Sequence, residues 1–186
     1  MVPLTALWLP ILLAAVIVFV ASAIMHMLLP YHKSDYQKLP DEDKLLATLR
    51  AANLKRGLYV FPFCTEQKEL KSPAMIEKYK QGPVGMMTIF PSAAPAMPKL
   101  LAMWFVYCLV IGLFVACLTG NTVAPGARYL AVFRVAGTAA FLAYGVGQLV
   151  NSIWAGQPWS VTIKHVIDGL IYGLLTAGTF GWLWPR

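Results

Sequence analysis

Charged residues are scarce in this sequence and nearly absent from four long stretches. Only 12% of the 186 residues are charged, about half the share of an ordinary soluble domain. A helix rises about 1.5 Å per residue, so roughly twenty apolar residues cross a hydrocarbon core of about 30 Å. The composition therefore predicts an all-α membrane protein, a single domain over residues 1–186 with four transmembrane helices. The predicted spans are Leu4–Leu29, Leu100–Leu118, Tyr129–Ile153 and Val161–Trp184.

Signatures of catalysis and of bound cofactors are also missing. The three cysteines, Cys64, Cys108 and Cys117, form no CxxC pair, and no Cys/His spacing indicates zinc, an iron–sulfur cluster or a disulfide framework. The segment Gly82–Gly85 lacks the glycine spacing and the lysine of a phosphate-binding loop. No Ser or Cys lies in a nucleophile elbow. We therefore predict no catalytic residue and no metal ligand; whether the protein is an enzyme stays open, with a non-enzymatic role favoured.

The basic residues are concentrated in one polar segment, residues 30–99. Eleven of the fifteen Lys and Arg and seven of the eight Asp and Glu lie there, a net charge of +4 (11 − 7). The positive-inside rule places this segment in the cytoplasm, so four spans put both termini outside. Mixed signs beside a membrane indicate contact with the lipid bilayer rather than with nucleic acid. A signal peptide cleaved near Val20–Ala23 would reverse the orientation, but no Lys or Arg precedes the apolar run.

The cytoplasmic segment is predicted to be partly helical. Asp41–Arg56 has acidic residues at its start and basic residues at its end, as a helix dipole favours, and Gly57 is suited to end that helix. Ser72 before Pro73 is typical of the start of a second, short helix. Leu58–Phe63 is expected to be extended. We interpret the segment as a cap on the inner leaflet, with a partner-docking surface as the alternative.

Small residues recur every four positions in the last two predicted spans. Such stripes let helix backbones approach closely within lipid. A short connection between the two spans makes them antiparallel neighbours, so we expect a tightly packed hairpin, although a partner helix is an alternative occupant of either stripe. The stripe residues are Ala139, Ala143 and Gly147 in the third span and Gly169, Gly173, Ala177 and Gly181 in the fourth.

Several polar residues lie within or at the ends of the predicted spans. An ionisable group at membrane depth is costly, usually faces protein or water, and is a functional-site hypothesis by default. We expect His165 to point towards Gly147 and Asn151, and Arg134 to lie at the margin of reach of Asp168. Three roles stay open: hydrogen bonds that hold the bundle together, a path for protons, ions or solutes, and a ligand pocket. The candidate cluster is His26, Arg134, Gln148, Asn151, His165 and Asp168.

Heme is the one cofactor that the histidines suggest. A b-type heme with two axial histidines needs two such residues at similar depth on different spans. His26 and His165 meet that requirement. Nothing else in the sequence supports a heme site, so no cofactor is predicted and heme stays an alternative.

Several runs of the sequence together resemble a family of small bacterial membrane proteins. The resemblance covers most of the chain and implies a four-span protein of the bacterial inner membrane. No activity is assigned to that family, so it supplies no functional residues. The runs are His32–Tyr36, Leu39–Asp43, Tyr59–Pro62, Gly82–Gly85, Val132–Phe141 and Asp168–Trp182.

Two classes of function follow from these features. The first is a non-enzymatic accessory or scaffold subunit that docks a membrane-protein partner. The second is a protein that translocates protons, ions or small solutes through Asp168 and His165. Because four spans leave little room for a path, the second class predicts a homo-oligomer.

Overall fold

Long apolar helices make up one part of the chain and short polar elements the other. The computed structural model describes residues 1–186 and divides them into two compact units. Met1–Tyr36 and Ala96–Arg186 form the first, the helical unit; Gln37–Pro95 form the second. Most of the polar segment, residues 30–99, which the sequence predicts to be a cap within one membrane domain, belongs to the second unit.

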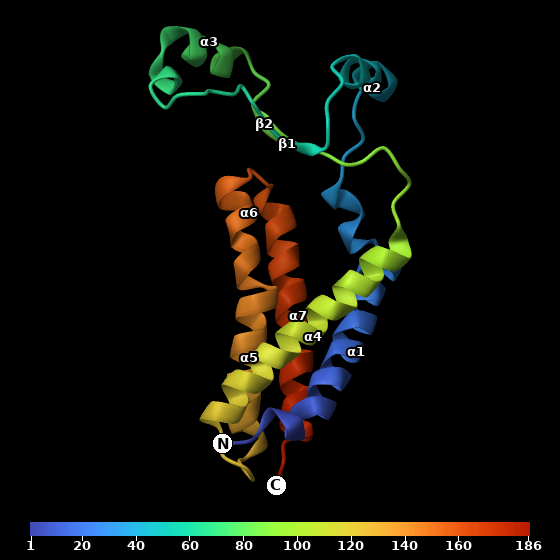
Figure 1. The fold of residues 1–186 in the computed structure, drawn as a ribbon, viewed down its shortest axis with the longest axis vertical. Helices are drawn as coiled ribbons and strands as arrows, with labels where there is room; N and C mark the ends of the chain where they lie inside the picture. The colour runs from blue at the N-terminus through green and yellow to red at the C-terminus, as the bar shows by residue number, and fades with distance from the viewer. The chain divides into compact units, whose positions relative to one another are not determined.

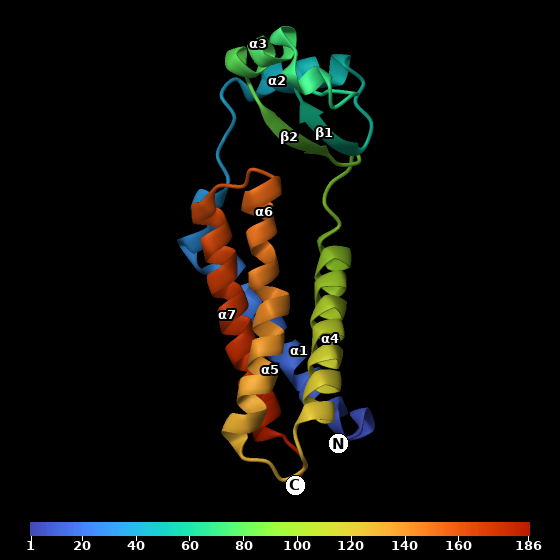
Figure 2. The same cartoon turned by 90° about the vertical axis from the view of Figure 1, so that its left-hand side faces the viewer.

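Four long helical segments run alongside one another in the helical unit (Figure 1). The first segment joins a 3₁₀ turn (Leu4–Leu7), α1 (Trp8–Ala23) and the π-helical turn η2 (Ile24–Leu28); the second is α4 (Met97–Thr122). The third joins α5 (Tyr129–Tyr144), η5 (Val146–Gln148) and α6 (Leu149–Trp154), and the fourth is α7 (Trp159–Trp182). Both termini lie at one end of this unit, as the two views agree (Figures 1 and 2).

Three of these segments are long and apolar enough to cross a membrane, as in a multi-pass membrane protein. They are Leu4–Leu28, Met97–Thr122 and Tyr129–Trp154, so three of the four predicted spans are confirmed by length and composition. The fourth candidate, α7, is a continuous helix of 24 residues. It does not belong to this set, and Lys164, His165 and Asp168 lie within it. Its insertion into the membrane stays a prediction.

The glycines of α7 lie in its seam with α5. A Cβ added at Gly169 would lie 2.3 Å from the Cα of Gly145, and one at Gly173 would lie 3.1 Å from the backbone nitrogen of Phe141. Hydrogen in place of a side chain therefore permits backbone contact between these two helices. The chain reverses direction at Ala155–Pro158, so the segment formed by α5 and α6 runs antiparallel to α7 (Figure 2).

The face that α5 presents to α7 differs from the predicted stripe. Gly137, Phe141 and Gly145 contact α7, whereas Ala143 and Gly147 are exposed and Ala139 is half-buried. The contacting positions are displaced by two residues from the predicted ones, which is a rotation of about 200° around the helix. Both sets recur every four residues, so small-residue spacing alone does not distinguish them.

Two tryptophans tie the ends of the helical unit together. The indole nitrogen of Trp104 in α4 donates to Ser22 Oγ in α1, at 2.8 Å, and that of Trp184 donates to the carbonyl of Ala124, at 2.9 Å. Between these ends the interior is mostly apolar, with Thr119 and Thr176 among its buried polar residues. Its fully buried residues include Leu7, Val18, Val115, Val132 and Phe180.

The second unit contains two short helices and a two-stranded antiparallel sheet. Its elements are α2 (Glu42–Ala51), β1 (Gly57–Phe61), α3 (Pro73–Gln81) and β2 (Gly85–Ile89). In the register of the sheet, Gly57 pairs with Ile89 and Phe61 with Gly85. Ser72 caps α3 as predicted, since its hydroxyl accepts a hydrogen bond from the Met75 backbone nitrogen at 3.3 Å.

The first of these helices is shorter than predicted. It ends at Ala51 rather than near Arg56, and Gly57 opens β1 instead of ending the helix. Asn53 adopts a positive φ of 50°, the left-handed conformation that ends many helices and that asparagine tolerates well. An asparagine two residues past the helix, and not the later glycine, therefore provides the stop.

Candidate functional site

All three histidines of the chain meet at one buried carboxylate, Asp168. The oxygen Oδ2 of Asp168 lies 3.0 Å from His32 Nε2, 3.8 Å from His26 Nε2 and 3.8 Å from His165 Nδ1. The imidazole rings pack together: the ring of His32 stacks on that of His26, with centroids 4.1 Å apart, and on that of His165, at 5.5 Å. We call these four residues the His–Asp cluster.

Two irregular turns after α1 deliver two of the histidines. The π-helical turn η2 carries His26, and its backbone closes through a bond from Leu29 N to Ile24 O at 3.1 Å. Such π turns within or at the end of α-helices are frequent at functional sites. Pro30 then starts the 3₁₀ turn η3 (Pro30–Asp35), in which His32 and Asp35 are three residues apart. In a 3₁₀ helix such residues lie on the same side, so one turn presents both side chains.

The remaining residues come from the first turns of α7. Lys164, His165 and Asp168 are separated by one, three and four positions, and residues three or four apart share a helix face. Tyr31 joins η3 to this face, because its hydroxyl donates to the Lys164 carbonyl at 3.0 Å and lies 3.2 Å from Asp168 Oδ1. The site is therefore assembled between the end of the first helical segment and the start of the last.

Asp35 holds the histidine and the lysine of this site together. One carboxylate oxygen accepts from Lys164 Nζ at 2.6 Å and the other lies 2.6 Å from His32 Nδ1. Lys164 Nζ also donates to the Tyr31 carbonyl at 2.9 Å and to Ser34 Oγ at 2.8 Å. Lys164 thus pairs with Asp35, and not with Asp168 one turn further along its own helix.

The surroundings shift the pKa values of two groups on η3. Burial disfavours the charged form of Asp35, but the hydrogen bonds from Lys164 and His32 outweigh it and hold the pKa of this carboxyl below its ordinary value. Burial, and then the negative charge of Asp168, raise the pKa of the Tyr31 hydroxyl to about 12. At neutral pH Asp35 is therefore an anion and Tyr31 a neutral donor.

Two buried atoms at the centre of the cluster have no hydrogen-bond partner. They are His32 Nε2 and Asp168 Oδ2, which face each other at 3.0 Å without the alignment of a hydrogen bond. The residues are only 8% and 2% exposed, and buried polar atoms without partners are rare and costly. Both atoms are electron-pair donors when His32 carries its proton on Nδ1 and donates it in a hydrogen bond to Asp35, so a shared cation would satisfy both.

The predicted polar residues divide into those that meet here and those that do not. His26, His165 and Asp168 belong to the cluster, but His165 contacts the other histidines rather than Gly147 and Asn151. Asn151 donates to Gln148 at 3.1 Å, in a pair of its own. Arg134 lines a shallow apolar cavity of about 350 Å³ between α5 and α7, with Phe133, Phe141 and Leu170 among its other walls.

Sequence-based reasoning did not identify three residues of this candidate site, Tyr31, His32 and Asp35. The signal that identifies two of them is a repeated His-x-x-Asp pair, His32–Asp35 and His165–Asp168. Each pair brings an imidazole and a carboxylate to one side of a helical turn. The repeat is short, and its importance becomes visible only because the two turns pack against each other.

The geometry does not fit a heme between His26 and His165. Their ring centroids are 6.3 Å apart, but the rings are stacked at 23° rather than aligned end to end. The ring of His32 also packs against both of them and leaves no space for a porphyrin. No step of the function is therefore assigned to heme.

Comparison with known proteins supplies no further guide to this site. No protein-family model matches the chain, and no curated protein or solved structure is significantly similar to it.

Proposed function

We propose that this chain is a bacterial inner-membrane protein that binds and translocates a cation through its His–Asp cluster. In this proposal α7 is the fourth span, residues 37–95 lie in the cytoplasm and both termini lie outside. The excess of Lys and Arg in that segment supports the orientation. The shared position of the two termini at one end of the helical unit suits an even number of spans (Figure 1).

The observation that carries this proposal is the convergence of every histidine of the chain on buried Asp168. Ionisable groups at the end of a membrane bundle are expensive to bury, and their retention favours a functional role. A cluster that only held helices together would satisfy its own polar atoms. This one leaves His32 Nε2 and Asp168 Oδ2 without partners, which favours a cation as the missing partner.

The charges at the site favour a cation over an anion or a neutral solute. Lys164 neutralises Asp35 at 2.6 Å, whereas Asp168 faces the Tyr31 hydroxyl and the imidazoles and has no ion pair with a lysine or arginine. With two carboxylates and one ammonium group, and the histidines counted as neutral, the site has a formal charge of −1 (1 − 2). A bound cation would offset that charge where water offers little screening.

Exposure favours exchange of the bound cation with one side of the membrane. The side chains of His26 and His165 are 41% and 33% exposed, while those of His32 and Asp168 are nearly inaccessible. The cluster therefore has a buried pair and a more accessible pair. Passage to the other side needs a further copy of the chain, because the four helices pack closely around an apolar interior.

Flux through purified, reconstituted protein tests this proposal. Proteoliposomes with wild-type protein are loaded with a pH-sensitive dye, or with a zinc-sensitive dye, and challenged with a gradient of protons or of Zn²⁺. We expect flux of one cation that Asp168→Asn abolishes. The matched control is Asp43→Asn, which removes an exposed carboxylate of α2 and should keep the flux. Wild-type vesicles that behave as protein-free vesicles for both cations would contradict translocation.

An accessory role in a membrane complex is the second candidate, and the two-stranded sheet of the second unit favours it. One face of β1 and β2 exposes the apolar side chains of Leu58, Val60 and Met86, at 64%, 44% and 41%. Exposed apolar patches of this kind mark interaction surfaces. A stoichiometric partner that co-purifies with wild-type protein and is lost in Leu58→Ser/Val60→Ser, but kept in the α2 variant Leu46→Ser, would favour this role.

A further inference from the structure

We infer that the His–Asp cluster is a transition-metal site that binds one Zn²⁺-like divalent ion through His26, His32 and Asp168. This inference rests on the proposed function and names the cation that the site takes. One donor atom from each of the three residues lies within 4.8 Å of the other two. Two of the residues come from η2 and η3 and the third from α7, so the ion would join the first and last helical segments.

The donor spacing suits a small divalent ion. Bonds of about 2.0–2.1 Å in a tetrahedral zinc site place neighbouring donor atoms roughly 3.3 Å apart. The distances from Asp168 Oδ2 to His32 Nε2 and His26 Nε2, 3.0 and 3.8 Å, lie on either side of this value. The two histidine donors lie within 4.8 Å of each other, so side-chain movements that bring them closer together would place all three donors around one ion.

Each buried donor is already oriented by its other polar atom. Asp35 accepts a hydrogen bond from His32 Nδ1–H at 2.6 Å, which leaves the lone pair of Nε2 for the metal. Carboxylate–histidine–metal arrangements of this kind fix the ring and raise its basicity. The Tyr31 hydroxyl engages Asp168 Oδ1 at 3.2 Å, so Oδ2 is the oxygen left for the ion. His32 Nε2 and Asp168 Oδ2 are the two atoms of the cluster that are buried without a hydrogen-bond partner.

The chemical types of the donor atoms narrow the choice of metal ion. Imidazole nitrogens with one carboxylate suit Zn²⁺ and its first-row neighbours, whereas Mg²⁺ and Ca²⁺ prefer sites made of oxygen. None of the three cysteines belongs to the cluster, which disfavours a site for a soft, thiolate-seeking ion such as Cu⁺. A dication would also change the net charge of the site from −1 to +1.

His165 lies beside the three donors and would become a fourth ligand after a movement of its side chain. Its Nδ1 lies 3.8 Å from Asp168 Oδ2, and its ring packs beside that of His32. It is one-third exposed, so it can leave the ion while the other three donors stay in place. In a translocating protein this residue would admit and release the metal, and its loss should weaken binding less than loss of His32.

Metal content of the purified full-length protein tests the site directly. Protein carrying a tag without histidine is incubated with ZnCl₂ or MgCl₂, freed of excess ion by gel filtration and measured by mass spectrometry of the metal. We expect about one Zn²⁺ per chain and no Mg²⁺. His32→Ala and Asp168→Ala should lose the Zn²⁺, and Asp35→Asn should lower the affinity about 10–100-fold. Co²⁺ should give the visible absorption of a tetrahedral site.

Two further variants distinguish the loss of a metal ligand from a general folding defect. His26→Ala removes the most exposed ligand and should bind Zn²⁺ more weakly while eluting as wild type. Asn151→Ala, whose side chain pairs with Gln148 outside the cluster, should bind Zn²⁺ normally. Zn²⁺ bound equally by wild type, His26→Ala and His32→Ala would overturn the inference, because the ion would then lie elsewhere.

The outcomes separate this inference from the proposed function. Wild-type protein without Zn²⁺ but with Asp168-dependent proton flux would overturn the metal site and leave cation translocation in place. Zn²⁺ bound at the cluster with no flux of either cation would support the metal site and contradict translocation. Protein that shows no Zn²⁺ binding and no flux would overturn both the metal site and the proposed function.

Discussion

His32 and Asp168 come from opposite ends of the helical unit's sequence and place Nε2 and Oδ2 3.0 Å apart. His32 is held by Asp35 and Asp168 by Tyr31, through their remaining polar atoms. The pair therefore couples the turn after the first helical segment to the start of the last. Any cation that binds between the two atoms also stabilises the contact between those segments.

Zinc should stabilise the wild-type protein against unfolding and should not stabilise His32→Ala. A ligand that binds only the folded state at 100 times its Kd adds about 2.7 kcal/mol to the free energy of unfolding. Thermal unfolding in detergent, with Zn²⁺ and then with a chelator, measures the difference. Equal stabilisation of both proteins by Zn²⁺ would place the ion outside the cluster.

Gly169→Ala should separate α5 from α7. The added methyl would lie 2.3 Å from the Cα of Gly145, a backbone atom that cannot move aside. Overpacking of this kind costs about 1–3 kcal/mol and occasionally more. Gly178→Ala on the same helix is the control, because its methyl meets only the Tyr129 hydroxyl, at 3.6 Å. Unfolding in detergent should show a large loss of stability for the first variant only.

The contribution of Asp35 to stability should disappear in acid. Its pKa is lowered in the folded protein despite burial, by hydrogen bonds from Lys164 and His32. Protons therefore bind the unfolded chain more tightly, so the contribution is present above the ordinary pKa, about 3.9, and is lost as pH falls through the folded value.

This dependence is measured as the difference in stability between wild type and Asp35→Asn, without metal, from pH 7 to pH 3. We expect a constant gap at neutral pH that closes only below about pH 4. Asp43→Asn, on exposed α2, is the control for loss of a carboxylate outside the site. A gap that widened in acid would contradict a lowered pKa.

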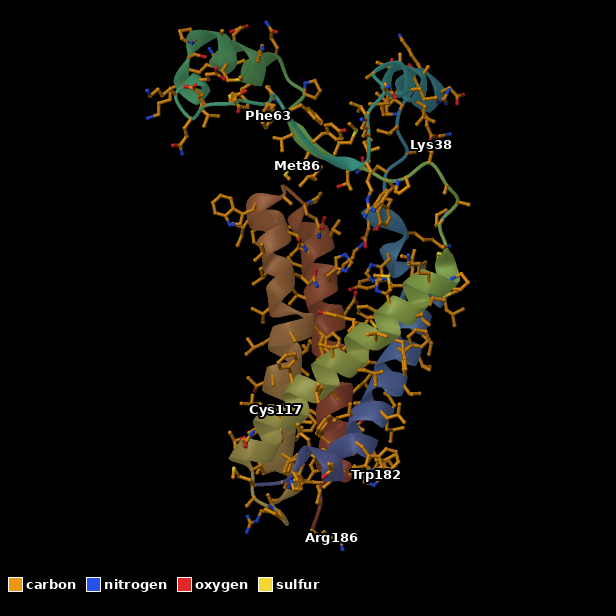
Figure 3. The ribbon with its side chains drawn as sticks, viewed as in Figure 1. Lys38, Phe63, Met86, Cys117, Trp182 and Arg186 are labelled. Atoms are coloured by element: carbon orange, nitrogen blue, oxygen red, sulfur yellow. The ribbon has the colours of Figure 1, made fainter.

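Cysteine labelling should place residue 64 and the C-terminus on opposite sides of the membrane. Cys64 belongs to the second unit, whereas Cys117, Trp182 and Arg186 lie towards the end of the helical unit where the termini are (Figure 3). In spheroplasts an impermeant maleimide should label Arg186→Cys, made in a Cys117→Ser background, but should reach Cys64 only after permeabilisation. Labelling of both positions from the same side would mean that α7 does not cross.

Much of the local structure follows from short-range pattern. Uninterrupted apolar runs predict the membrane helices because length and hydropathy are properties of the segment itself. Ser72 and Pro73 predict the start of α3 for the same reason, since a cap acts within one turn. The spacing of Gly169 and Gly173 likewise predicts a close helix contact.

The sequence by itself determined that the chain has long apolar helices and where most of its elements begin. Only the tertiary structure decided which face of α5 meets α7 and which polar groups meet one another. Gly145 and not Gly147 contacts Gly169, because helix rotation depends on how all the side chains pack together. His32 and Asp35 reach His165 and Asp168 because η2 and η3 turn the chain back against α7. That turn depends on contacts between segments far apart in the sequence, so no local pattern specifies it.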